Sequence, residues 1–132
     1  MKKLFLSIII SLLALSSVFG KVLNFAEYRN LKKDTKVRID YVNSITSMPK
    51  WSKTSLEVWK LTETITVYLT LGTEEQKKQA LKDFFANQDK FSIQSQIIIL
   101  HADKRFSEVN QLIEMNKNKL TSNFVKKYYT EY

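Results

Sequence analysis

The chain contains very few residues that break regular structure. Its 132 residues include two glycines, Gly20 and Gly72, and one proline, Pro49. An all-β fold needs many tight turns, and glycine and proline are the residues that most often form them. Their scarcity also leaves no glycine-rich loop of the kind that cradles a phosphate or a dinucleotide. The chain is therefore expected to be mostly helical and to lack the common nucleotide-binding motifs.

Residues 1–20 show the three parts of a secretory signal peptide. A positively charged start, an apolar run and a stretch of small residues follow one another. The alternative is an uncleaved anchor helix, but the apolar run is shorter than the roughly 20 residues that span a bilayer. We therefore expect cleavage between Gly20 and Lys21. The mature product, residues 21–132, is expected to be secreted and extracellular, with no membrane span.

Composition limits what this product can be. Its length suits a single domain that buries a core without covalent cross-links. The chain has no cysteine, which excludes disulfides, thiol catalysis and cysteine-ligated zinc. The formal net charge of the whole chain is +8, with lysines spread along it and acidic residues interleaved. Nucleic-acid binding would need a concentrated basic stripe with base-reading residues, so it is not expected.

Apolar residues recur at helical spacing through most of the mature chain, which predicts an all-α bundle of four to five helices. The expected helices lie within residues 23–45, 52–71, 73–86, 91–103 and 103–128. Residues 62–70 are rich in threonine, isoleucine and valine and would also suit a strand. A helix is favoured there because Gly72 reads as its end. Thr73 and Gln76 form a capping box that starts the next helix.

A short pattern occurs twice in the middle of the chain. Lys50-Trp51-Ser52-x-x-Ser55 is echoed by Lys90-Phe91-Ser92-x-x-Ser95. An aromatic residue and a serine before an apolar-periodic segment are typical of a helix start. We interpret the echo as two helix–loop–helix units that pack their apolar stripes together, with chance matching as the alternative to duplication. The aromatic residues of this region are predicted to be core residues: Trp51, Trp59, Phe84, Phe85 and Phe91.

At these residues the chain resembles the small secreted SXP/RAL-type proteins of nematodes. The similar features are spread over about residues 37–115: the apolar-Asn junctions Val42-Asn43 and Ala86-Asn87, a tryptophan at Trp59, and the segments 76–81 and 107–109. The chain departs from the family pattern in a shortened helix after the tryptophan. The resemblance implies a secreted, all-α, non-enzymatic protein with an EF-hand-like, cation-binding domain.

The sequence contains no complete EF-hand loop. Such a loop needs oxygen ligands at fixed offsets, a glycine at its sixth position and a glutamate at its twelfth. Frames that begin at Asp40, Asp83 or Asn87 all fail this test. Asn87 and Asp89 are the candidate metal ligands, and they also suit a loop whose side chains bond their own backbone. Only a weakly held Mg²⁺ or Ca²⁺ is left open, and no other cofactor is expected.

No catalytic constellation is found in the sequence. His101 is the one histidine, and it lies near a predicted helix end without a nucleophile or carboxylate placed to work with it. We therefore expect a non-enzymatic protein that binds a partner outside the cell.

Two alternative binding roles follow from the composition. The many aromatic residues would allow a carrier of a lipid or other hydrophobic ligand, although at helical spacing they more often form a core. The basic, amphipathic helices would allow a membrane-active protein, but interleaved acidic residues dilute their polar faces.

Overall fold

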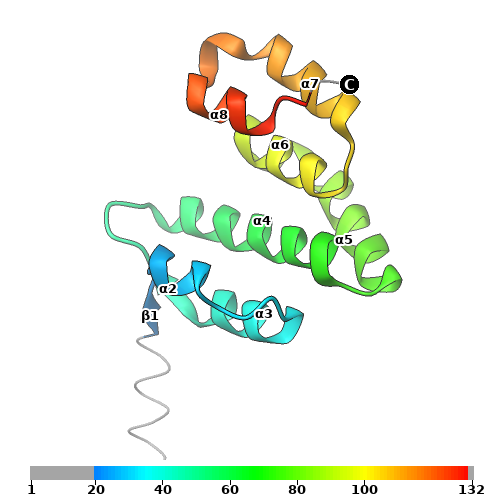
Figure 1. Ribbon diagram of the computed structural model, residues 1–132. Helices are drawn as coiled ribbons and strands as arrows, with labels where there is room; N and C mark the ends of the chain where they lie inside the picture. The colour runs from blue at the N-terminus through cyan, green and yellow to red at the C-terminus, as the bar shows by residue number, and fades with distance from the viewer. Residues whose placement is uncertain (1–19, 131–132) are drawn as a thin grey trace, which may run out of the picture.

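The computed structural model describes residues 20–130, which form seven α-helices and two very short strands (Figure 1). Residues 1–19 of the predicted signal segment, 1–20, lie outside the described residues. The helices are α2 (Phe25–Arg29), α3 (Thr35–Ser44), α4 (Lys53–Leu71), α5 (Glu74–Ala86), α6 (Ile93–Ala102), α7 (Phe106–Met115) and α8 (Ser122–Tyr128). The strands β1 (Lys21–Val22) and β2 (Ile45–Ser47) pair in parallel. The predicted all-α bundle is confirmed.

The number of helices differs from the expected four to five because two stretches are interrupted. Residues 23–45 form α2 and α3, and Asp34 caps α3 by accepting a hydrogen bond from the backbone N–H of Val37. The last predicted helix, 103–128, is interrupted after α7 ends at Met115, where the side chain of Asn116 donates to the carbonyl of Leu112. A 3-10 turn, η2 (Lys117–Lys119), then leads into α8.

Helix α4 includes the threonine-rich stretch, so the helical prediction for residues 62–70 is confirmed. Thr62, Thr64, Thr66 and Thr70 each donate their hydroxyl to the carbonyl four residues earlier, at 2.7–2.9 Å. These bonds satisfy the threonine hydroxyls within the helix, so the side chains need no partner outside it. Gly72 ends α4, and a Cβ there would overlap the carbonyl oxygen of Tyr68.

Helix α4 lies between two separate groups of buried residues (Figure 1). The N-terminal core lies on the side of α2, α3 and β2 and comprises Leu23, Tyr28, Tyr41, Val42, Ile45 and Leu56. The C-terminal core joins α4 to α5, α6 and α7, and its members are Ile65, Leu69, Ala80, Phe84, Phe91, Ile97, Ile99, Leu100, Val109 and Ile113. Both cores include side chains of α4, so this helix connects the two halves of the fold.

The predicted aromatic core is correct at some positions and wrong at others. Phe84 and Phe91 are buried, with ring centroids 5.4 Å apart, and Trp59 packs half-buried against the N-terminal core. Trp51 and Phe85 are 39% and 44% exposed, so their prediction as core residues was wrong. Consecutive positions of a helix point about 100° apart, so Phe85 cannot share the inward direction of Phe84.

The two echoed segments form the same kind of helix start. Ser52 and Ser92 cap α4 and α6, and each accepts a hydrogen bond from the backbone N–H three residues later. Thr121 caps α8 in the same way, after Lys119 and Leu120. The structure therefore contains a third helix start of this kind, which differs from the others in having leucine for the aromatic residue and threonine for serine.

Candidate functional site

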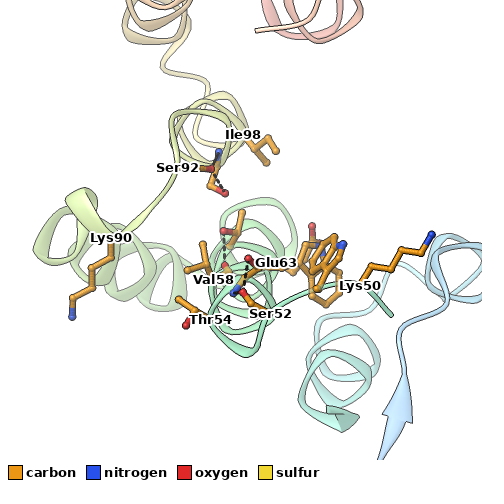
Figure 2. Close-up of a pocket in the computed structure, with 13 residues that line it drawn as sticks. Lys50, Ser52, Thr54, Val58, Glu63, Lys90, Ser92 and Ile98 are labelled. Atoms are coloured by element: carbon orange, nitrogen blue, oxygen red, sulfur yellow. Dashed lines mark hydrogen bonds between the residues drawn. The ribbon is translucent and has the colours of Figure 1, made fainter. Parts of the chain in front are cut away.

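The main candidate site is an open cleft of about 540 Å³ between the start of α4 and the start of α6 (Figure 2). Both copies of the echoed pattern line it. Lys50, Trp51, Ser52 and Ser55 come from the first copy, and Lys90, Ser92 and Ser95 come from the second. The sequence shows that the two segments are alike but not that they face the same cavity, because α4 and α6 meet only through tertiary packing.

The apolar part of the cleft comes from both helices. Trp51, Val58 and Trp59 lie at the α4 side, and Ile98 lies on α6. These side chains are exposed or half-buried, so their apolar surface is open to a ligand. Such surface gains free energy when a ligand removes it from water.

Two aromatic residues of helix α2 pack against the two tryptophans. The ring of Phe25 lies 6.4 Å from Trp51 and 6.2 Å from Trp59, and Tyr28 lies 5.9 Å from Trp59. The contacts with Trp59 are edge-to-face, a favoured geometry for aromatic pairs. This five-residue helix therefore fixes the positions of the indole rings at one end of the cleft.

The polar part of the cleft includes two hydroxyl pairs. The Oγ atoms of Ser52 and Ser55 are 2.9 Å apart, and those of Ser92 and Ser95 are 3.1 Å apart. Figure 2 shows the capping member of each pair, Ser52 at the start of α4 and Ser92 at the start of α6. The matched spacing of the two segments thus places equivalent hydrogen-bonding groups around one cavity.

Glu63 also lines the cleft and belongs to a small polar cluster with α2 and α3. Its carboxylate accepts a hydrogen bond of 2.8 Å from the hydroxyl of Tyr28, and the Arg38 guanidinium lies 5.2 Å from the Tyr28 ring centre. Burial raises the pKa of Glu63, and this outweighs the opposing effects of Tyr28 and Arg38. Burial and the adjacent carboxylate also raise the pKa of Tyr28, so its phenol stays protonated and donates.

Replacing Glu63 with glutamine is expected to raise the melting temperature slightly at pH 7.5. The raised pKa means that the folded state binds the Glu63 proton more tightly than the unfolded state does. The stability linked to this group is present at low pH and is lost as the pH rises through the folded-state pKa. Glutamine keeps an acceptor for Tyr28 without the charge, so its advantage over the wild type should shrink towards pH 4. Thermal melts at both pH values check this. A lower melting temperature at pH 7.5 would contradict it by showing that Arg38 stabilises the ionised carboxylate.

The predicted metal ligands lie outside the cleft. Asn87 ends α5 and donates from its side chain to the carbonyl of Asp83, at 2.9 Å. Asp89 is exposed in the 3-10 turn η1 (Gln88–Lys90). Within residues 20–130 there is no group of three or more histidine, aspartate or glutamate side chains that could hold a metal ion.

His101 lies in the last turn of α6, near the predicted helix end. Its ring makes edge contacts with Phe106 at 5.3 Å and Tyr128 at 5.2 Å. The histidine thus joins α6 to the helices α7 and α8, and these ring contacts give it a packing role.

Comparison of the chain with protein-family models, curated proteins and solved structures found no match. In the part of the chain that the structure describes, no helix is both long enough and apolar enough to cross a membrane.

Proposed function

We propose that this chain is a secreted, non-enzymatic protein that binds a small apolar or amphipathic molecule in the cleft between α4 and α6. One observation carries the proposal: two tryptophans, Val58 and Ile98 line a single cleft of about 540 Å³. Ligand pockets have volumes of about 300–1,000 Å³ and combine apolar and aromatic walls with a few polar groups. The cleft meets both descriptions.

Secretion is supported by the sequence of residues 1–20, which has the three parts of a signal peptide. An extracellular carrier of a poorly soluble molecule would need an apolar site on a soluble surface, and the excess of basic over acidic residues that remains after residue 20 favours solubility. Mass spectrometry of the protein secreted by a host cell tests this part of the proposal. A mature protein that begins at Lys21 is expected, and retention of the chain in the membrane fraction would contradict it.

Binding can be tested with a neutral dye whose fluorescence increases in apolar surroundings. The wild-type protein is expected to bind the dye with a stoichiometry near one. Ile98→Trp places a larger side chain in the cleft and should weaken binding at least tenfold. The matched control is Leu61→Trp, because Leu61 is 39% exposed on α4 and does not line the cleft.

Circular dichroism melts should show that both variants remain folded. Equal dye binding by Ile98→Trp, Leu61→Trp and the wild type would contradict the proposed site, as would an equal loss in both variants.

A further inference from the structure

We infer that the ligand of this cleft is a single-chain anionic amphiphile of the fatty-acid class, whose carboxylate accepts hydrogen bonds from the serine hydroxyls that line the cleft. The inference rests on the proposed function and adds the chemistry of the ligand's polar end. Its support comes from the hydrogen-bond donors, the charge and the apolar wall of the same cavity.

The two serine pairs leave hydrogen-bond donors for a ligand. Ser52 accepts the backbone N–H of Ser55 and donates its hydroxyl hydrogen to the Ser55 oxygen. The two hydroxyls share one hydrogen bond, so one hydroxyl hydrogen of the pair has no acceptor in the described part of the chain. Ser92 and Ser95 repeat this arrangement on α6. The cavity therefore offers one unused hydroxyl donor from each side.

An ionised carboxylate matches this pair of donors. Its two oxygens only accept hydrogen bonds, and they accept several at once. Hydrogen bonds to an ionised acceptor are also stronger than those between neutral groups. An alcohol would accept fewer and weaker bonds, and an ammonium group would accept none.

The charge around the cleft favours an anion. Lys50 and Lys90 lie at its rim and form no ion pair among residues 20–130. Figure 2 shows both side chains extending away from the centre of the cleft, so they act by making the rim positive rather than as direct ligands. Among residues 20–130, Glu63 is the one acidic residue that lines the cleft, and its carboxylate accepts a hydrogen bond from Tyr28.

The apolar wall accounts for the chain of the amphiphile. Val58 and Trp59 follow the Ser52–Ser55 pair by about one helical turn, and Ile98 follows Ser95 by the same interval on α6. Residues three or four apart lie on the same face of a helix. Each helix therefore presents a hydroxyl group followed by an apolar side chain, which matches a polar head joined to an alkyl chain.

The test compares ligands that differ only in the head group. Dodecanoate, dodecanol and dodecylammonium are titrated against the bound neutral dye at pH 7.5, in low salt and below the concentrations at which they aggregate. The carboxylate is ionised at this pH. We expect dodecanoate to displace the dye at a concentration at least tenfold lower than dodecanol, with dodecylammonium the weakest.

Variants then assign the preference to the serines. The double variant Ser55→Asp with Ser95→Asp should weaken dodecanoate binding at least tenfold and leave dodecanol binding within twofold, because each new carboxylate accepts the neighbouring serine hydroxyl and repels an anionic head group. The capping hydroxyls of Ser52 and Ser92 remain, so both helices should keep their starts. Ser107→Asp is the control, because Ser107 is an exposed serine in the first turn of α7 that does not line the cleft.

The outcomes separate this inference from the proposed function. Equal displacement by dodecanoate and dodecanol would overturn the anionic assignment and leave the apolar site standing. Stronger displacement by dodecylammonium would also overturn it and would indicate a cation near Glu63. A double variant that keeps the full preference for dodecanoate would show that these serines do not bind the carboxylate. Dye that does not bind the wild-type protein would contradict the proposed function itself.

Discussion

Replacing Phe84 with alanine is expected to lower the free energy of unfolding by about 3–5 kcal/mol. The Phe84 side chain is fully buried in the C-terminal core, where its ring lies 5.4 Å from that of Phe91. Its removal would leave a cavity that the surrounding helices fill only in part. Small domains have total stabilities of about 5–15 kcal/mol, so this single change would remove a large fraction. Urea denaturation followed by far-UV circular dichroism measures the loss.

Phe85→Ala is the matched control, at the next position of the same helix. Phe85 is 44% exposed, and the guanidinium of Arg105 lies 5.1 Å from its ring centre. An exposed cation–π contact contributes about 0.5–1 kcal/mol, so the expected loss is of that size. Similar losses for Phe84→Ala and Phe85→Ala would contradict the orientation of α5.

Local signals in the sequence were sufficient to locate several helix ends. The capping box at Thr73 is present, with reciprocal hydrogen bonds to Gln76 of 3.2 and 2.9 Å. Ser52 and Ser92 cap the helices that follow them, and Gly72 ends α4. These features depend on residues within one helical turn of each other, so the sequence of that turn is enough to predict them.

The break in the last predicted helix was missed because the apolar spacing continues across it. Ile113 and Leu120 are seven residues apart, an interval that keeps both on one side of a continuous helix. In the structure, Asn116 and the 3-10 turn η2 interrupt the helix, and Thr121 starts α8. The available signal was the Lys119-Leu120-Thr121 segment, which resembles the two echoed helix starts but lacks their aromatic residue.

The candidate cleft depends on contacts between residues that are far apart in the sequence. Ser55 and Ser95 are forty positions apart, and no local pattern shows that α4 and α6 pack with their starts around one cavity. The same limitation explains why the prediction that Trp51 is a core residue was wrong. Aromatic character predicted burial, but Trp51 precedes α4 and stays partly exposed beside Phe25 of α2.

Replacing Ile45 with alanine is expected to lower the free energy of unfolding by about 2–5 kcal/mol. Ile45 is fully buried in the N-terminal core, and its carbonyl accepts a hydrogen bond of 2.7 Å from the side chain of Lys60. The substitution keeps this carbonyl, so the loss reports on apolar packing alone. Urea denaturation measures it, and the exposed residue Val37, replaced with alanine, serves as the control.

The two core variants together test whether α4 makes the fold a single cooperative unit. Both tryptophans lie beside the N-terminal core or α2, so their fluorescence reports on that half of the molecule, whereas circular dichroism reports on all helices. Since α4 contributes buried residues to both cores, loss of either core should unfold this helix and expose the other. We therefore expect Phe84→Ala to shift the fluorescence and circular dichroism transitions together, although the substitution is in the opposite core from the tryptophans. A fluorescence transition that stays at its wild-type midpoint in Phe84→Ala would show that the halves unfold independently.

The cleft spans both halves, with Trp59 packed against the N-terminal core and Val58 against the C-terminal core. Independent unfolding would then open the proposed binding site under conditions in which half of the chain remains folded.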